Sequence, residues 1–403
     1  MKHKIKQIIT STFTGLSIFN KIDYCLLLLI SITLSQNIFI CLKILYTIPI
    51  WLIVKLFLRE KGLNKALLRS GKICIIFLML YYLLCLISLL WTENHWWGHY
   101  WVSQKRAFIL IPIFFLFSDF RFLDKKHLRI ILYFFSLGLS IRFIYKLFIA
   151  TTLSIKGTTS FFTYFGGVAG EHHGYIALMA TLGICFLFME IINTNPAYKW
   201  QKSTQIFSIL CLCCYIFCVQ SRAGIIGLYS VSFFMLAYSL YNKKHKLCIA
   251  ILSFTLCFFF SSKIISKHIE YTSRTTNTYK EVLTGDHKDI RFEIWENAIR
   301  TIKDYQCWWP WGVGIGDQDD VLVEHYRRSS ILFSILPATL LHTHNQFMST
   351  LINIGIIGEL LLLLILTIPI YLIFKNKITH KVYFISLLYL FVANSLVEPM
   401  IDG

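Results

Sequence analysis

Long apolar runs without charged side chains recur along almost the whole chain, and this feature constrains the fold more than any other. Many of them approach the roughly 20 residues that a helix needs to cross the hydrocarbon core of a bilayer. Charged residues make up only 15% of the 403 residues, whereas a soluble domain averages about 25%. The pattern therefore predicts an all-α integral membrane protein.

The apolar runs predict eleven membrane-spanning helices. The run at 107–118 is short and contains Pro112, so a re-entrant segment is the alternative there. No small-residue cleavage site follows the first apolar run, so we expect that run to remain as the first span. The expected spans cover residues 22–38, 40–58, 73–91, 107–118, 130–150, 174–192, 204–220, 223–241, 246–262, 346–374 and 382–398.

The net charge of +18 sits mainly in short loops between the expected spans. With the N-terminus placed in the cytoplasm, strongly basic loops alternate with loops that carry few basic residues, which is the distribution that orients membrane proteins. Because no soluble basic domain carries the charge, we expect membrane lipid and no nucleic acid as a partner. The loops assigned to the cytoplasm are 59–72, 119–129, 193–203, 242–245 and 375–381.

One long segment, 263–345, mixes ten Lys and Arg with eleven Asp and Glu and falls on the outer side. We expect it to fold as a small helical cap between the membrane helices of 1–262 and those of 346–403. Within the cap, 291–305 is expected to form an amphipathic helix. The cytoplasmic loops are too short for a nucleotide-binding domain, so any chemistry must use the outer face. The apolar face expected for the cap helix consists of Phe292, Trp295, Ile299 and Ile302.

Several basic residues at the expected outer face could bind an anion. Arg222 is expected in the turn between two spans, where a guanidinium and helix N–H groups can hold a phosphate, although it could merely reach lipid headgroups. Arg291 precedes Trp295 by four residues, so the two side chains share one face of a helix and could bind the anion together. The alternative is that Arg291 is simply a solvent-exposed charge. Lys105 and Arg106 follow a tryptophan-rich stretch typical of a membrane interface, and Arg106 could reach inward.

Histidines also gather on this face. His172 follows a glycine-rich loop and precedes the span at 174–192. It could bind substrate, or it could simply cap the N-terminus of that helix. His342 and His344 could bind a divalent metal together with Glu324 or with Asp317, Asp319 and Asp320. A single histidine that removes or orients a hydroxyl proton is favoured instead, because an ordinary pKa near ~6.5 suits neutral pH. Eleven of the twelve cysteines lie in apolar runs, so no disulfide framework is expected.

The motifs together resemble those of the O-antigen ligase and polymerase superfamily, which are integral-membrane glycosyltransferases of the bacterial envelope. His344 and Asn345 are followed by nine residues, Gly355, two residues and Gly358. This spacing is similar to the ligase signature, and the resemblance covers about 90–398. The other matching elements are Ser221, Arg222 and Gly224, then Arg291 with Trp295, the glycine turn Gly312, Gly314 and Gly316, and Arg106 with Leu110.

The resemblance implies a GT-C-like helical fold with eleven or twelve membrane helices. The donor would be a glycan on undecaprenyl diphosphate, and the acceptor would be a sugar hydroxyl of the lipid A-core. Transfer would invert the anomeric centre at the periplasmic face of the bacterial inner membrane, with no metal or other cofactor. Family members have twelve spans with both ends in the cytoplasm, whereas eleven spans leave the last expected helix ending outside.

The resemblance also implies roles for individual residues. Arg222 and Arg291 would stabilise the charge on the departing diphosphate oxygen. His344 would activate or orient the acceptor hydroxyl, and we expect it to form the catalytic group together with these two arginines. Gly355 and Gly358 would allow a neighbouring helix or lipid tail to approach closely. The residues expected to bind substrate are Arg106, Lys105, His342, Asn345, His172 and Trp295.

Three alternative functions remain. An O-antigen polymerase would use the same donor with a growing lipid-linked glycan as acceptor, but the spacing after His344 favours a ligase. A transporter of lipid-linked glycan would place charges near mid-membrane, and the main charges within the expected spans are Arg142, Lys146 and Glu190. A membrane scaffold without activity would leave the converging outer arginines without a role.

Overall fold

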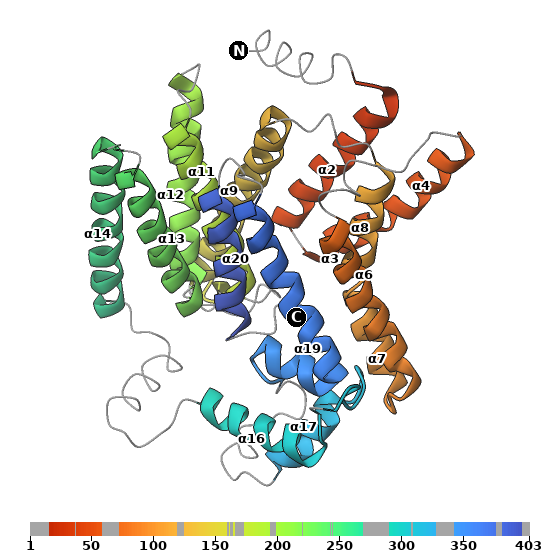
Figure 1. The fold of residues 1–403 in the computed structure, drawn as a ribbon. Helices are drawn as coiled ribbons and strands as arrows, with labels where there is room; N and C mark the ends of the chain where they lie inside the picture. The colour runs from red at the N-terminus through yellow and green to blue at the C-terminus, as the bar shows by residue number, and fades with distance from the viewer. Residues whose placement is uncertain are drawn as a thin grey trace.

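Every regular element in the described part of the chain is a helix, which confirms the all-α class (Figure 1). Among the described residues, eight helices are long and apolar enough to cross a membrane, so the protein is a multi-pass membrane protein. The computed structural model describes residues 16–36, 38–58, 72–118, 125–158, 161, 164–165, 173–193, 199–219, 221–241, 243, 245–268, 290–307, 309–327, 342–375 and 381–396.

A helix lies in the described part of every expected span. The long ones are α2 (Ile18–Gln36), α6 (Lys72–Ile87), α9 (Lys125–Ile155), α11 (His173–Asn193), α12 (Lys199–Val219), α13 (Arg222–Tyr241), α14 (His245–His268), α19 (Gln346–Lys375) and α20 (Lys381–Ser395). The shorter ones are α3 (Ile38–Leu45), α4 (Thr47–Phe57), η1 (Ser88–Leu90), α7 (His95–Gln104), α8 (Ala107–Phe117), α16 (Ile290–Asp304) and α17 (Gln318–Tyr326).

Two expected spans differ in detail from the structure. The span at 40–58 is two helices, because the chain breaks at Tyr46 and Pro49 cannot donate a backbone hydrogen bond in the first turn of α4. The span expected at 107–118 is longer in the structure, because α7 and α8 together form one apolar stretch, His95–Phe117, that is long enough to cross a bilayer. The described apolar parts of α14 and α20 are shorter than the other spans.

Helix α11 is the centre of one half of the molecule, packed against α9, α12, α13 and α20. Small residues allow this packing: a Cβ on Gly183 would lie 2.9 Å from Leu212 of α12. Helices α2, α3, α4, α6 and α8 form the other half, and α2 packs on α9. Helix α19 runs between the halves to the end of the molecule where α16 and α17 lie (Figure 1).

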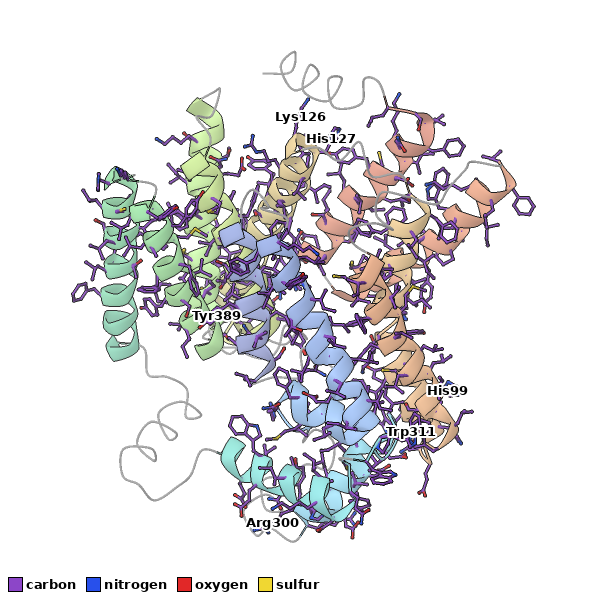
Figure 2. The ribbon with its side chains drawn as sticks, in the orientation of Figure 1. His99, Lys126, His127, Arg300, Trp311 and Tyr389 are labelled. Carbon is purple, nitrogen blue, oxygen red and sulfur yellow. The ribbon has the colours of Figure 1, made fainter. Side chains whose placement is uncertain are left out.

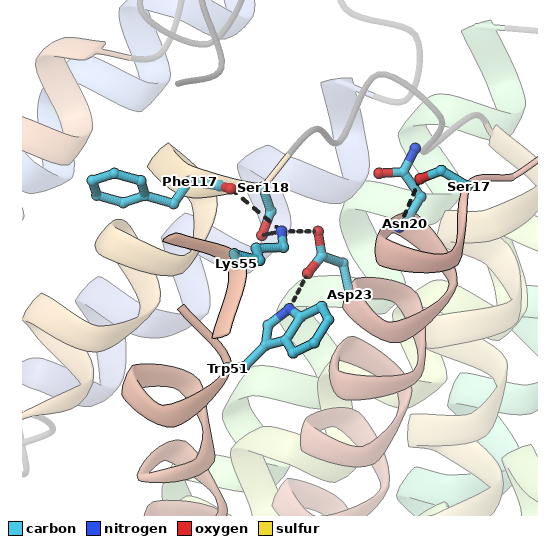
Figure 3. Close-up of polar contacts among 7 residues, drawn as sticks. All are labelled: Ser17, Asn20, Asp23, Trp51, Lys55, Phe117 and Ser118. Carbon is cyan, nitrogen blue, oxygen red and sulfur yellow. Dashed lines mark hydrogen bonds and ion pairs between the residues drawn. The ribbon is translucent and has the colours of Figure 1, made fainter. Parts of the chain in front are cut away.

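A buried ion pair joins three helices of the second half (Figure 3). Lys55 Nζ of α4 lies 2.7 Å from Asp23 Oδ2 of α2, and both side chains are almost fully buried. The indole N–H of Trp51 donates to Asp23 Oδ1 at 2.7 Å. Lys55 also donates to Ser118 Oγ and to the Phe117 carbonyl at the end of α8. Charges buried this deeply are stable only when they are paired and hydrogen-bonded, as these are.

Replacing Asp23 by Asn should destabilise the fold by about 3–5 kcal/mol, because Lys55 would stay charged and buried without its partner. The double variant Asp23→Asn/Lys55→Met should recover part of this loss. The midpoint of thermal unfolding in detergent measures both effects. Glu296→Gln is the control, since that carboxylate pairs with Arg300 on an exposed surface. Equal midpoints for Asp23→Asn and Glu296→Gln would contradict the structural role of the pair.

Candidate active site

The first residue before α19, Asn345, is an N-cap. Its side-chain oxygen accepts hydrogen bonds from the backbone N–H groups of Phe347 at 2.9 Å and Met348 at 3.1 Å. Its amide nitrogen donates to the Leu396 carbonyl just beyond α20 at 3.2 Å. These bonds fix where α19 begins and tie that point to α20. A contact between Asn345 and substrate stays a prediction.

The two histidines form a tight turn immediately before this cap. His344 has a left-handed backbone with φ 47°, which is unusual for a residue other than glycine. Its N–H donates to Nδ1 of His342 at 3.2 Å, and the ring centroids are 4.1 Å apart. The buried Thr343 hydroxyl between them donates to the Asn345 carbonyl at 2.8 Å. The turn thus presents the two imidazoles side by side, and neutral His342 carries its proton on Nε2.

A row of buried polar side chains follows on the first turns of α19. Gln346 donates to Thr350 Oγ1 at 3.0 Å, and the Tyr81 hydroxyl of α6 hydrogen-bonds the same Thr350 oxygen at 3.4 Å. Gln318 of α17 accepts from the Ser349 hydroxyl at 2.5 Å and from Asn353 Nδ2 at 2.8 Å. This network attaches α19 to α6 and α17.

Sequence reasoning missed this network because the polar residues lie inside a run expected to be apolar. Their spacing of three or four residues is the available signal, since it places them on one face of a helix. Asn353 also keeps a buried oxygen that has no hydrogen-bond partner in the described part of the chain. A buried amide oxygen of this kind is normally satisfied by water or by a ligand.

A small polar pocket collects Lys105, His342, Gln318 and Asn353 beside the ring of Trp101. Lys105 is only 2% exposed and lies with Nζ 5.7 Å from the centre of the Trp101 ring. Two residues expected to bind substrate, Lys105 and His342, therefore meet here from elements more than 200 positions apart in the sequence. Gln318 and Asn353 are polar pocket residues that the sequence did not indicate.

Arg106 lies apart from that pocket. Its guanidinium stacks on the ring of Tyr46, with 4.4 Å between the guanidinium carbon and the ring centre. Its buried Nε has no hydrogen-bond partner among the described residues. The adjacent residues Lys105 and Arg106 therefore reach different surroundings, the first toward His342 and the second toward the break between α3 and α4.

The start of α13 explains the Ser-Arg-x-Gly element. Ser221 is the N-cap, because its hydroxyl oxygen accepts the N–H of Gly224 at 3.2 Å. Arg222 is consequently the first residue of the helix rather than part of the preceding turn, which corrects the expected position. A Cβ on Gly224 would lie 2.3 Å from the Cβ of Ala177 in α11, so only glycine permits this contact. The Arg222 side chain and all of His172 lie outside the described residues.

Helix α16 forms where the cap helix was expected, but its buried face is different. Ile294 and Ala298 are buried, whereas Ile299 is 42% exposed. Two polar residues also lie on the buried face because they bond back to their own helix: Asn297 donates to the Glu293 carbonyl and Thr301 to the Asn297 carbonyl. Hydrophobic periodicity counts such polar residues as exposed. The face expected to be buried therefore differs from the observed buried face by about one residue position around the helix.

Trp295 lies at the edge of the same core. It packs against a cluster that includes Ile294, Leu322 of α17 and Ile352 of α19. The helical backbone puts Arg291 one turn before Trp295 on the same side of α16, although the Arg291 side chain lies outside the described residues. Cys307 belongs to this core too, and burial raises the pKa of its thiol to about 11, so it stays protonated.

Helix α19 is broken at Gly355, where φ is 71°. The Ile352 and Asn353 carbonyls, freed by the break, accept the N–H groups of Val313 at 2.8 Å and Gly314 at 3.0 Å. The Ile356 N–H donates to the Trp309 carbonyl at 3.4 Å. The glycine-rich turn after α16 therefore supplies the partners that the helix lacks.

This contact corrects the expected role of the two signature glycines. A Cβ on Gly355 would lie 2.5 Å from backbone atoms of Trp309, Pro310 and Gly312. The partner is thus the backbone of a loop rather than a neighbouring helix or a lipid tail. Gly358 lies one turn beyond the break, where a Cβ would be 2.2 Å from the side chain of Ile354 of the same helix.

The acidic stretch after the turn holds it to the start of α7. Asp317 accepts the backbone N–H groups of Glu93 at 2.9 Å and Asn94 at 2.8 Å. Asp320 accepts from the Asn94 side chain at 3.1 Å. Glu324 accepts from the hydroxyl of Tyr305. Within the described ranges, no three His, Cys, Asp or Glu side chains gather as metal ligands would.

Gly355→Ala should destabilise the protein more than Gly157→Ala. Both glycines have a positive φ, 71° and 67°, so alanine is strained at either position by roughly 1–3 kcal/mol, and the ψ of −168° at Gly355 belongs to a region that is essentially restricted to glycine. Open space surrounds Gly157, whereas a Cβ at Gly355 collides with the 309–312 backbone. The midpoints of thermal unfolding of the two variants measure this difference. Equal shifts of the two midpoints would show that the loop does not fill the break.

A comparison with known families supports the identity of this region. Residues 207–364 match the family model described as O-antigen ligase. The matched segment runs from α12 to the first half of α19 and includes the Ser221 cap, α16, the glycine turn, both histidines and the break. No curated protein matches the chain. The matched segment covers less than half of the chain, and it supports the resemblance to the O-antigen ligase family, whose members are glycosyltransferase-like membrane enzymes of the ligase or polymerase type.

Proposed function

We propose that the protein is an O-antigen ligase that transfers a glycan from undecaprenyl diphosphate to a sugar hydroxyl of the lipid A-core. The observation that carries the proposal is the start of α19. There the His-Asn signature forms a tight turn and a helix cap, and the signature glycine forms the break that holds the cap helices in place. The proposed site faces the periplasm from the bacterial inner membrane, with 263–345 as the outer cap.

His344 would orient or deprotonate the acceptor hydroxyl. Its ring lies beside that of His342 and is neither fully buried nor fully exposed, so a substrate can reach it while the turn holds it still. An imidazole that can accept a proton near neutral pH suits this step. His342, Lys105 and Asn353 line the adjacent pocket, whose volume of about 10 Å³ has room for a single water-sized group, so there they would bind one sugar or phosphate oxygen.

Arg222 and Arg291 would stabilise the leaving diphosphate. Arg222 opens α13, where the N–H groups of the first turn and the helix dipole favour an anion. Arg291 lies in the first turn of α16, the cap helix that packs on the start of α19. Negative charge grows on the departing oxygen in the transition state, so cations placed there lower the barrier without a metal. Arg106, His172 and Trp295 complete the proposed substrate-binding set.

A ligase is favoured over a polymerase by the nine-residue and two-residue spacings that follow the His344–Asn345 pair. Both enzymes would use the same lipid-linked donor, so the acceptor distinguishes them. A polymerase would lengthen the glycan on its own carrier, whereas a ligase would place it on the lipid A-core.

Transfer by purified protein in liposomes tests the proposal, with the lipid-linked glycan as donor, lipid A-core as acceptor and EDTA present. His344→Ala, Arg222→Ala and Arg291→Ala should each lower the rate by about a hundredfold or more. His99→Ala and Arg300→Ala are matched controls, because these residues lie at the outside of α7 and α16 (Figure 2). Both controls should keep the wild-type rate.

Two results would contradict this proposal. Wild-type rates in the three active-site variants would remove His344 and the arginines from the site. A glycan that lengthens on its lipid carrier, with no transfer to the lipid A-core, would show that the protein is a polymerase.

A further inference from the structure

We propose that an aromatic pocket beside the 305–312 turn binds a sugar ring of the glycan, at a subsite distinct from the histidine turn. The inference rests on the proposed function, because the ligand is the glycan that the enzyme transfers. We call this site the tryptophan pocket. Its lining includes Trp91, Tyr305, Gln306, Trp309, Trp311 and Gly312.

The tryptophan pocket has the size and rigidity of a ligand site. Its volume is about 490 Å³, within the range of small-molecule pockets. The rings of Trp91 and Trp311 meet edge to face with their centres 5.8 Å apart. The backbone behind the rings is fixed, since the Trp309 carbonyl and the Val313 and Gly314 N–H groups bond to the broken part of α19. Rings held by a rigid backbone lose little freedom on binding.

The rings remain available to a ligand. Trp309 is 66% exposed and Trp311 is 48% exposed, although each is large enough to bury much apolar surface. The indole nitrogen of Trp91 is buried behind the rings and has no hydrogen-bond partner in the part of the chain that the structure describes. Gln306 has a left-handed backbone with φ 50° because it ends α16: its N–H donates to the Lys303 carbonyl at 3.2 Å, and the next N–H, of Cys307, donates to the Ile302 carbonyl at 2.9 Å.

The chemistry of the lining favours a sugar over an acyl chain. The C–H face of a pyranose ring packs flat on an indole, and its hydroxyls need polar partners at the edge of the ring. Gln306 supplies an amide, and the Tyr305 hydroxyl donates to the Glu324 carboxylate beside it. Ile87 is the aliphatic member of the lining, so an acyl chain would find little of the flexible aliphatic surface on which it packs.

The tryptophan pocket and the histidine turn are connected through one loop. Gly312 lines the pocket, and a Cβ on it would lie 2.5 Å from the Ile352 carbonyl of α19. Figure 2 shows Trp311 beside α7, at the end of the molecule that carries α16 and α17. A glycan of several sugars could therefore place its reacting end at His344 and a remote sugar in the tryptophan pocket. Such a subsite should affect KM for long glycans more than kcat.

Binding is measured first, on full-length His344→Ala protein in nanodiscs, so that turnover does not interfere. The probe is free glycan, released by mild acid from the lipid-linked glycan of the bacterium that makes this protein. Trp309→Ala should weaken binding by about tenfold, and Trp309→Phe should retain most of it. Trp96→Ala is the matched control, because Trp96 is 69% exposed on α7 and does not line the pocket. Unchanged unfolding midpoints confirm that the variants fold.

Transfer assays with the otherwise wild-type enzyme complete the test. Trp309→Ala should raise KM for long lipid-linked glycans and leave kcat unchanged, with no effect on a donor that carries one repeat unit. Equal glycan binding by Trp309→Ala, or displacement of the free glycan by undecaprenyl phosphate, would overturn the sugar subsite. Weakened glycan binding in Trp309→Ala, together with no transfer by wild type, would support the subsite and refute the ligase proposal.

Discussion

The break in α19 at Gly355 is the constraint on which the rest of the site depends. A helix inside a membrane protein cannot leave backbone carbonyls without partners, because water is scarce there and each unsatisfied group is costly. The glycine turn supplies these partners through the N–H groups of Val313 and Gly314. The backbones of the glycine turn and of α19 come so close that neither Gly312 nor Gly355 can carry a side chain. The signature glycine Gly355, which the sequence places inside a helix, therefore forms a junction between α19 and the glycine turn.

This junction determines where the cap lies. The glycine turn connects α16 to α17, so fixing the turn on α19 also fixes both cap helices against the start of that helix. Asp317 extends the connection to the start of α7. Residues from α7, α17 and α19 consequently meet around Lys105, His342 and Asn353. One interaction between two backbones thus organises side chains that are far apart in the sequence.

The sequence predicted the helices well and their polar contacts poorly, for physical reasons. Apolar runs report directly which segments can enter lipid, so α9, α11 and α13 appear where they were expected. The pair Asp23 and Lys55 was missed, since a charge within an apolar run shows no partner until the helices pack. The face of α16 was misjudged because Asn297 and Thr301 satisfy their polar groups within the helix. The positive φ of Gly355 depends on a loop about 40 residues earlier, which no local pattern reports.

The motifs pointed to Ser221 and Asn345, but they did not show the structural roles of these residues. The Ser221 and Asn345 side chains cap helices, and these roles could have been recognised from their place before an apolar run. The pocket residues Gln318 and Asn353 could not have been recognised from the sequence, because they come together only when the junction at Gly355 has formed.

The most direct test of the account is a cryo-EM structure of the His344→Ala protein with the lipid-linked glycan bound. We expect the first sugar to lie beside His342 and the diphosphate to lie at the N-terminus of α13. A diphosphate bound instead between α9 and α12, near Arg142 and Lys146, would contradict the assignment of the active site to the start of α19.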